Sequence, residues 1–425
     1  MPILTAKYVE RFQCIGPACE DTCCHGWSVQ LTREDKKRLD VALDKAPEAL
    51  RERKTAIVAD PHADKSSPRP FVMQTTAEGY CQFLSPERLC QIHSTLGEQL
   101  LPGVCAQYPR EVARFGGTRE MWAALSCPEA VRLCLLSESG AELCELEEVP
   151  GLRHEQANLV IHDQTPDYQA YLDEIRRYVV ELLSLRDFSV RARLFFIAYF
   201  AHRVGSYFDA STTTVDRKRL SHDMQALRDP NLLGQLAAEL DSVSVPGTYA
   251  ISLVASVTKS RTGLSAYPEP AWAHSEAFIS PPLEAHETLS TAAWLDSWID
   301  YSTRRLRWEN EFSGLLEQAF ENYCKLFWMK EWYIQSSSLL AHANACLLRV
   351  AIVRHRLFTH PDLDSSTAGM SHDEKRQLLE RKLVAVVTSV ARAVEHDRPF
   401  LRVLNDALAR HGMQDLAHTA LLLLL

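Results

Sequence analysis

The chain has 425 residues, of which 46% are hydrophobic and 24% charged, and this length is enough for a large core in about two or three folding units. Its formal net charge of -9 argues against a sequence-independent grip on phosphate backbones, which needs a basic surface. Nucleic acid is therefore not an expected partner.

The N-terminal residues do not resemble a signal peptide, because Lys7, Glu10 and Arg11 interrupt the place where an apolar stretch would lie. No run approaches the roughly 18 apolar residues of a spanning helix, and residues 421–425 are far too few. We expect a cytoplasmic protein without a membrane span. In that reducing compartment clustered cysteines persist as thiolates, so they indicate metal ligands or catalytic groups rather than disulfides.

The first 145 residues hold ten of the 12 cysteines and are punctuated by glycine and proline. This composition predicts short helical pieces alternating with loops, with helices near residues 32–46 and 131–136 and a loop over 60–79. No alternation of strand period is evident. The expected organisation is a cysteine-rich metal or iron–sulfur module over residues 1–150.

From residue 166 apolar residues recur every three or four positions, which predicts amphipathic helices. The expected helices cover residues 168–183, 188–204, 224–240, 249–258, 294–333, 337–357, 371–395 and 400–425. Ser371 and Glu374 form a capping-box start. Four prolines within residues 261–288 exclude a regular helix there and indicate a linker or lid. The fold class is therefore mainly α, with a helical bundle over residues 151–425.

The cysteine spacing begins as C-x4-C-x3-C-C from Cys14 to Cys24 and continues with Cys81, Cys90, Cys105 and Cys127. Soft thiolate donors match zinc or iron–sulfur clusters. Some of these residues are alternatively small buried hydrophobic groups, and we weigh the two interpretations evenly for Cys134 and Cys144.

Several named motifs are absent from the sequence. A radical S-adenosylmethionine motif would need a cysteine where Gly26 stands, and ferredoxin runs, paired C-x2-C knuckles and a GxGxxG turn do not occur. The adjacent Cys23 and Cys24 are awkward as two ligands of one iron site, because neighbouring side chains tend to diverge. One of them ligates while the other packs or serves a second metal.

An ordered set of short motifs carries a family resemblance. The matching residues are Tyr8, Phe12, Cys14, Cys19, Cys23-Cys24-x-Gly26-Trp27, Cys81-Gln-Phe83-Leu84, Leu89-Cys90-x-Ile92, Leu96-Gly97-Glu98, Cys105-x-x-Tyr108-Pro109-Arg110 and Ser126-Cys127-Pro128-Glu129-Ala130. With these residues the chain resembles the flagellin lysine N-methylases. Its cysteine part is also similar to a wider group of proteins regarded as iron- or zinc-chelating. Beyond residue 135 the resemblance rests on Glu321-Asn322-Tyr323 and Glu395-His396, and His25 and Cys324 depart from the pattern.

The resemblance implies methyl transfer from S-adenosylmethionine to surface lysines of flagellin, with a [4Fe-4S] cluster in the enzyme. The metal ligands would be drawn from eight cysteines, Cys14, Cys19, Cys23, Cys24, Cys81, Cys90, Cys105 and Cys127. Cys134, Cys144, Cys324 and Cys346 would lie outside the metal site.

Candidate catalytic residues are Tyr108, Glu98 and Tyr323, the last on the resemblance alone. Gly97, Glu98, Tyr108 and Arg110 are candidates for cofactor binding. Arg110 would clamp the donor carboxylate bidentately, and a structural ion pair is an equally weighted alternative. Ordinary packing is expected for the aromatic residues between 328 and 333, rather than a cage for lysine.

Methylation of an amine requires a neutral lysine nitrogen, whose reference pKa is about 10.4, so the site must desolvate the lysine and accept its proton. Two other functions remain open. One is a non-enzymatic zinc- or iron-binding scaffold, and the other is a redox sensor that changes partner binding when its cluster is lost.

Overall fold

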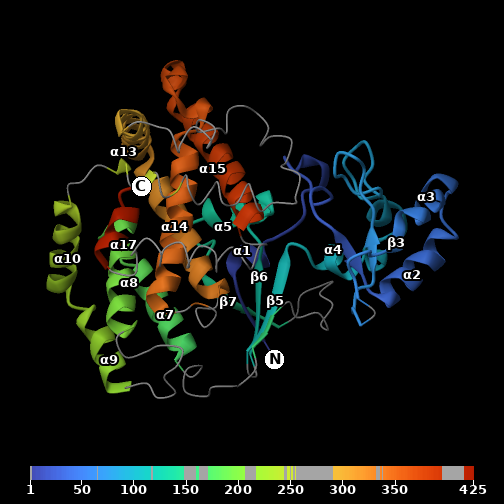
Figure 1. Ribbon diagram of the computed structural model, residues 1–425, viewed down its shortest axis with the longest axis horizontal. Helices are drawn as coiled ribbons and strands as arrows, with labels where there is room; N and C mark the ends of the chain where they lie inside the picture. Colours follow the sequence, from blue (N-terminus) through green and yellow to red (C-terminus); the bar gives the residue numbers. More distant parts are fainter. Residues whose placement is uncertain are drawn as a thin grey trace. The chain divides into compact units, whose positions relative to one another are not determined.

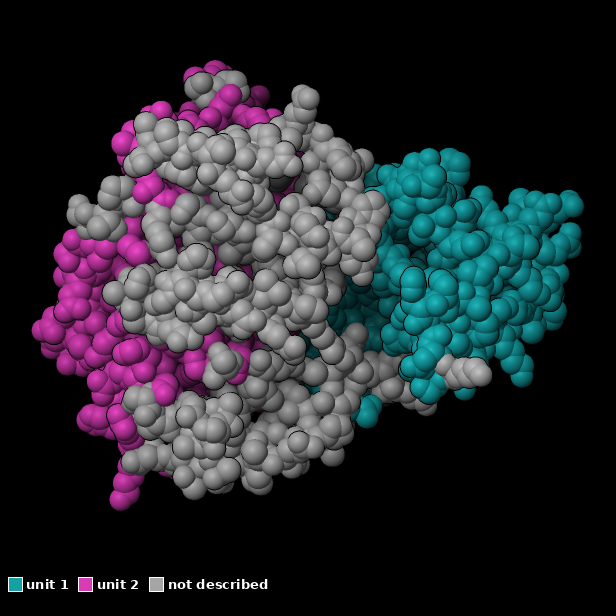
Figure 2. Space-filling view, in the orientation of Figure 1, with its two compact units in different colours: residues 1–133, 142–162, 265–275 teal, residues 134–141, 163–264, 276–425 magenta. Residues whose placement is uncertain are grey.

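The computed structural model describes residues 2–64, 66–115, 118–147, 159–161, 171–205, 217–243, 247, 248, 250, 251, 254, 291–331, 336, 338–394 and 416–425. The chain divides into two compact units, shown in teal and magenta in Figure 2. Unit 1 comprises residues 1–133, 142–162 and 265–275, and unit 2 comprises residues 134–141, 163–264 and 276–425. The predicted linker or lid over 261–288 lies outside the described residues.

Unit 1 contains a five-stranded sheet with the order β7-β1-β6-β5-β8. Its strands are β1 (Ile3–Ala6), β5 (Arg110–Phe115), β6 (Thr118–Ala123), β7 (Leu143–Leu146) and β8 (Leu159–Ile161). β5 pairs antiparallel with β6, and β1 runs parallel to β6 (Figure 1). The buried Tyr8 hydroxyl donates to the Ala123 carbonyl at 2.8 Å and accepts from the Ala123 amide at 2.7 Å. This double contact fixes α1 (Lys7–Glu10) to the sheet.

A second sheet of unit 1 has the order β2-β4-β3 and supports a separate small core. Its elements are β2 (Val29–Leu31), α2 (Arg33–Leu43), α3 (Glu48–Glu52), η2 (Arg53–Ala56), β3 (Ile57–Ala59), β4 (Phe71–Met73), η3 (Ile92–Leu96), η4 (Glu98–Leu100) and α4 (Gly103–Gln107). Leu31, Leu39 and Leu43 are completely buried in this core. Because Cys81, Cys90 and Cys105 pack against the same core, three predicted ligands stand on a folded support.

The mainly α fold class is confirmed. The helices predicted near 32–46 and 131–136 are also confirmed, as α2 and as α5 (Pro128–Leu135) respectively. The expectation of helices and loops alone in the first 145 residues is wrong, because β4 lies within the predicted loop and the unit holds two sheets. β1 is buried along its whole length and β2, β3 and β4 have three residues each. Such strands show no polar alternation that sequence could reveal.

Unit 2 is built from helices, as predicted. They are α7 (Leu172–Leu183), α8 (Val190–Gly205), α9 (Arg217–Ala226), α10 (Pro230–Ser242), α13 (Thr291–Lys330), α14 (Leu339–Phe358), η7 (Pro361–Leu363), η8 (Ser365–Gly369), α15 (His372–Val394) and α17 (Leu416–Leu422). α14 packs against both α8 and α15 (Figure 1). Within the described part of the chain, no helix combines the length and apolar character that crossing a bilayer requires.

Two predicted helix boundaries in unit 2 have a local explanation. The helix expected over 224–240 is two helices, because Pro230 cannot continue α9 and instead opens α10 after an Asp229 cap that accepts from the Asn231 amide at 2.9 Å. At the start of α15, the Ser371 hydroxyl and amide both donate to Glu374 at 2.8 Å, which confirms the capping box.

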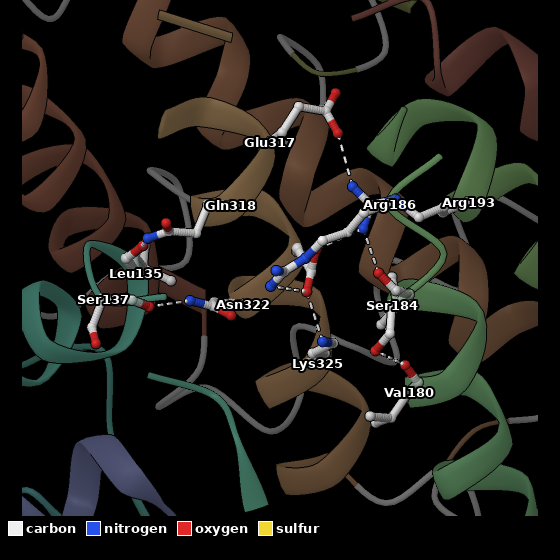
Figure 3. A network of polar contacts seen from close by, with 12 residues as sticks. Leu135, Ser137, Val180, Ser184, Arg186, Arg193, Glu317, Gln318, Asn322 and Lys325 are labelled. Atoms are coloured by element: carbon white, nitrogen blue, oxygen red, sulfur yellow. Dashed lines mark hydrogen bonds and ion pairs between the residues drawn. The ribbon is translucent and has the colours of Figure 1, made fainter. Parts of the chain in front are cut away.

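A buried ion-pair network joins α13 to α8 and to the connection between α7 and α8 (Figure 3). The Glu321 carboxylate accepts two hydrogen bonds of 3.1 Å from Arg186, one of 2.7 Å from Arg193 and one of 2.7 Å from Lys325. The Arg193 and Glu321 side chains are each 2% exposed. Burial alone would raise the pKa of Glu321, but these donors hold it at about 2.

The next residue on α13 makes a second structural contact within unit 2. The Asn322 amide donates to the carbonyls of Cys134 at 2.9 Å and Ser137 at 2.8 Å, and Gln318 donates to Leu135 at 3.2 Å (Figure 3). These contacts satisfy carbonyls at the C-terminal end of α5, where the helix provides no partners. Glu321 and Asn322, singled out by resemblance, therefore both hold the helical unit together.

Glu321→Gln should destabilise the protein by about 3–5 kcal/mol, because it removes the buried partner of Arg193 and leaves that arginine with only the more exposed Glu317. The free energy of unfolding from chemical denaturation measures this. As a matched control, Asp173→Asn breaks the exposed Asp173–Arg177 pair and should change stability by less than about 1 kcal/mol. Equal effects of the two substitutions would show that burial does not matter here.

The Glu321 contribution should depend on pH. Since the pKa of Glu321 is lowered to about 2, the unfolded chain takes up the proton first as the pH falls. The stabilisation is complete above about pH 4.5, the ordinary range of glutamate, and disappears as the pH approaches 2. The stability difference between the parent and Glu321→Gln should shrink over that interval. A difference that stays constant down to pH 2 would contradict this assignment.

Candidate functional site

All cysteines of the chain are free thiols, and the eight predicted ligands come from five places in unit 1. Cys14, Cys19, Cys23 and Cys24 lie between α1 and β2, and Cys81 follows β4. Cys90 precedes η3, Cys105 lies in α4, and Cys127 stands directly before α5. Cys14 and Cys23 are exposed, whereas the other six are partly buried.

The Cys24 thiol contacts two other predicted ligands, Cys23 and Cys90. The Cys24 thiol hydrogen-bonds to Cys23 and Cys90, which raises the pKa of Cys24 and lowers that of Cys90 to about 6. Backbone amides of His93 and Ile92 add further hydrogen bonds to the Cys90 sulfur. Hydrogen bonds of this kind stabilise a thiolate, which is the form that binds a metal.

Cys81 and Cys105 lie beside the same pair. The Cys81 amide donates to the Cys24 carbonyl at 2.7 Å, which fixes the two loops to each other. Burial raises the pKa of Cys81 to about 11, and a nearby Cys90 adds to the effect. The pKa of Cys105 is raised well above its ordinary value. Burial is the largest cause, and the neighbouring Cys90, Cys81 and Cys23 add to it. Several thiolates cannot share this volume without a cation.

Cys127 has Cys19 and Cys23 as its neighbouring predicted ligands. Burial raises the pKa of Cys127 to about 12, against hydrogen bonds from the Ala130 and Glu129 amides, and Cys19 and Cys23 are its neighbouring thiols. An ion pair of 2.5 Å between Arg132 of α5 and Glu20 ties the helix to the residue after Cys19. No local sequence pattern indicates this ion pair.

The donor chemistry of these side chains fits a thiophilic metal. Thiols gather around Cys23, Cys24 and Cys90, and backbone amides donate to four of the sulfurs, those of Cys19, Cys81, Cys90 and Cys127. Among the described residues, however, no three His, Cys, Asp or Glu side chains converge in the geometry of a bound ion. The thiols are neighbours that a metal would draw closer together.

Arg110 lies beside the exposed end of this cysteine region. Its guanidinium carbon stands 5.4 Å from the centre of the Phe12 ring, and its buried Nε has no hydrogen-bond partner in the described structure. Burial lowers the pKa of Arg110, while the nearby Glu98 and Cys14 raise it. The structure thus brings together Arg110, Glu98 and Cys14, and leaves a guanidinium donor available to an anion.

Tyr108 lies at the end of α4, close to the cysteine loop. Its hydroxyl is 3.0 Å from the Ser126 hydroxyl, and its ring is 5.8 Å from that of Trp27. The Trp27 indole nitrogen donates to the Cys23 carbonyl, so the tyrosine is connected to the metal-ligand candidates on two sides. The sequence analysis assigned no function to Ser126, although this residue directly precedes Cys127.

Gly97 shapes the turn that presents Glu98. Its φ of 94° is in the left-handed region, and a Cβ would lie 2.6 Å from the Gln99 side chain. The positive φ favours glycine at this position, whereas the flexible end of the Gln99 side chain could move aside. Glu98 itself is exposed at the start of η4. The turn therefore presents the Glu98 carboxylate to solvent. No ion pair of Glu98 is described.

The remaining candidates lie in unit 2. Tyr323 is 4% exposed within α13. Phe327 and Trp328 pack around His342 with ring centres 4.7 Å apart in both cases. Burial, and then Arg349 and Arg176, lower the pKa of His342 to about 3. A buried neutral histidine beside two arginines is unsuited to a lysine cage. The pair Glu395-His396 lies outside the described residues.

Comparison with known families gives two matches. Residues 176–422 match the FliB lysine N-methylase C-terminal domain, and residues 13–128 match a family described as "Putative zinc- or iron-chelating domain". No solved structure gives a significant match.

Curated relatives match over a shorter part of the chain. A lysine-N-methylase of Salmonella typhimurium is 26% identical over 138 residues, which are 32% of this chain and 33% of that protein. A second lysine-N-methylase, from Salmonella choleraesuis, matches equally. The flagellar biosynthetic protein FliU of Salmonella muenchen is 26% identical over 122 residues, 29% of this chain and 70% of FliU. The match thus spans about a third of the two lysine-N-methylases.

Proposed function

The chain belongs to the FliB lysine N-methylase family, and from this membership we propose that it is a protein-lysine N-methyltransferase. The proposed donor is S-adenosylmethionine, and the proposed substrates are surface lysines of flagellin. The single observation that carries the proposal beyond family membership is Arg110, a partly buried cation with a free donor at the edge of the cysteine region.

Arg110 would bind the carboxylate of the donor. The guanidinium is positioned by the Phe12 ring, and its unpartnered Nε offers one of the two parallel hydrogen bonds that a carboxylate accepts from arginine. Glu98 and the turn at Gly97 lie on the same side, where a carboxylate side chain would pair with the donor's ammonium group. Tyr108 is a further candidate for contact with the donor.

Transfer to lysine is an in-line displacement in which a nitrogen–carbon bond forms as the sulfur–carbon bond of the sulfonium breaks. The lysine must first lose a proton, because its reference pKa is about 10.4. Glu98 and Tyr108 are the proposed acceptors of that proton, directly or through water. Tyr323 remains a proposed catalytic residue on family resemblance alone.

The proposed metal group is a [4Fe-4S] cluster held by four of the eight cysteines. When bound, its iron ions would keep the ligating thiols deprotonated. Cys90 is a candidate ligand, because hydrogen bonds from Cys24 and from the His93 and Ile92 amides lower its pKa and so favour the thiolate. The same donors suit zinc. A zinc-bound scaffold without enzymatic activity is therefore the second candidate, since the donor set does not discriminate between the metals.

Protein purified anaerobically should be brown, and with S-adenosylmethionine it should add methyl groups to flagellin lysines. Mass spectrometry of flagellin digests counts these groups, and a matched reaction without the donor is the control. Colourless protein with stoichiometric zinc and no methyl transfer would favour the scaffold. Active colourless protein would retain the methyltransferase proposal but reject the cluster.

Arg110→Lys should raise the Michaelis constant for S-adenosylmethionine by about 10-fold or more, because lysine keeps the charge but loses the parallel hydrogen bonds. Arg88→Lys is the control, since Arg88 is exposed and lies near Cys90 in sequence. The visible spectrum and thermal midpoint of both variants should match the parent. A variant that loses metal or melts early with normal donor affinity would make Arg110 a structural residue.

A further inference from the structure

Trp27 and Tyr108 form an aromatic pair within unit 1. Their ring centres are 5.8 Å apart, and the ring planes are tilted by 36°. Trp27 lies two residues before β2, whereas Tyr108 directly follows α4, so the fold joins two rings that are distant in the sequence. Both side chains are partly exposed, and the pair is therefore accessible from solvent.

Hydrogen bonds fix the polar edges of both rings. The Trp27 indole donates to the Cys23 carbonyl, and the indole also packs against the small core of unit 1. The Tyr108 hydroxyl is held at 3.0 Å from the buried Ser126 hydroxyl. Gly26 directly precedes the tryptophan with a φ of 80°, a turn conformation that favours glycine. Side chains fixed in this way lose little freedom when they bind a ligand, so the pair is preorganised.

A second aromatic pair, in unit 2, has the same geometry and holds a cation. Trp298 and Tyr301 of α13 have ring centres 5.8 Å apart and a tilt of 36°. The guanidinium carbon of Arg305 lies over both rings, 6.0 Å from the centre of Trp298 and 5.7 Å from that of Tyr301. Aromatic faces attract cations electrostatically, and tryptophan does so most strongly. Such a pair can thus bind one cation with two rings.

The cations best suited to aromatic faces are those with weak hydration. A lysine ammonium is a strongly hydrated point charge, whereas a sulfonium or a methylated ammonium is surrounded by carbon. Tyr108 lies two residues before Arg110, which has the Glu98 carboxylate as a neighbour. The aromatic pair is therefore joined, through Tyr108, to the arginine proposed for the donor carboxylate.

We propose that Trp27 and Tyr108 form a binding site for an onium group, either the sulfonium of the methyl donor or the methylated ammonium of the product lysine. Both sources share one chemistry, a positive centre surrounded by methyl and methylene groups. The inference rests on the proposed function and deepens it, because it assigns the charged centre of a ligand to two aromatic faces.

The donor source is tested with S-adenosylmethionine and S-adenosylhomocysteine, which differ by one methyl group and its positive charge. Calorimetric titration of the full-length chain should show tighter binding of the charged ligand. Trp27→Leu should weaken that binding by about 3- to 30-fold and leave the neutral ligand near the parent value. Trp27→Phe should keep part of the preference, because it retains a ring. Trp298→Leu, which removes the equivalent ring of unit 2, is the matched control and should change neither affinity.

The product source is tested in the same way with a flagellin peptide that carries trimethyllysine and with the unmodified peptide. A preference for either charged ligand that Trp27→Leu abolishes supports the site and identifies its occupant. Equal losses for the charged and neutral ligands would make Trp27 a structural residue and overturn the proposal, as would a parent that prefers neither charged ligand.

These binding measurements separate the inference from the proposed function. A preference for the charged ligand in protein that transfers no methyl group would reject the proposed function and leave the onium site standing. Methyl transfer that is unchanged in Trp27→Leu, with an unchanged ligand preference, would retain the proposed function and reject the site.

Discussion

The crowding of thiols around Cys23, Cys24 and Cys90 is the constraint on which unit 1 depends. Burial and mutual repulsion oppose several thiolates in one small volume, and the pKa values of Cys81, Cys105 and Cys127 rise accordingly. Backbone amides act in the opposite direction and favour a thiolate at Cys90. A bound cation, as in the proposed function, would reconcile the two tendencies, because it would compensate the charge that the amides alone cannot.

In unit 2, basic side chains compensate a buried carboxylate. Glu321 is surrounded by Arg186, Arg193 and Lys325, so its buried charge is paired and hydrogen-bonded. The desolvation cost of such charges is offset only when geometry is good, and here the arginines provide it. The family-matched Glu321 and Asn322 thus have a structural explanation. The resemblance at these positions does not by itself indicate chemistry.

The proposed reaction needs donor binding and deprotonation more than it needs a metal. In the proposal, Arg110, Glu98 and Tyr108 would supply the groups for both steps within unit 1, close to Cys14 and Cys23. A polar transfer to nitrogen involves no electron transfer from a cluster. In the proposed function a bound metal would therefore serve as the framework that fixes these side chains, since preorganised groups lower the barrier to transfer.

The sequence by itself determined the class of the fold and predicted which cysteines are candidate metal ligands, because helical periodicity and cysteine spacing are local patterns. It did not reveal the strands of unit 1. β1 is buried throughout, and β2, β3 and β4 of the small sheet have three residues each. Tertiary structure alone decided which cysteines are neighbours, that Arg110 packs on Phe12, and that Arg132 pairs with Glu20. The residues in each of these last two contacts are about 100 positions apart in the sequence. No local sequence pattern indicates that such distant residues are neighbours in space.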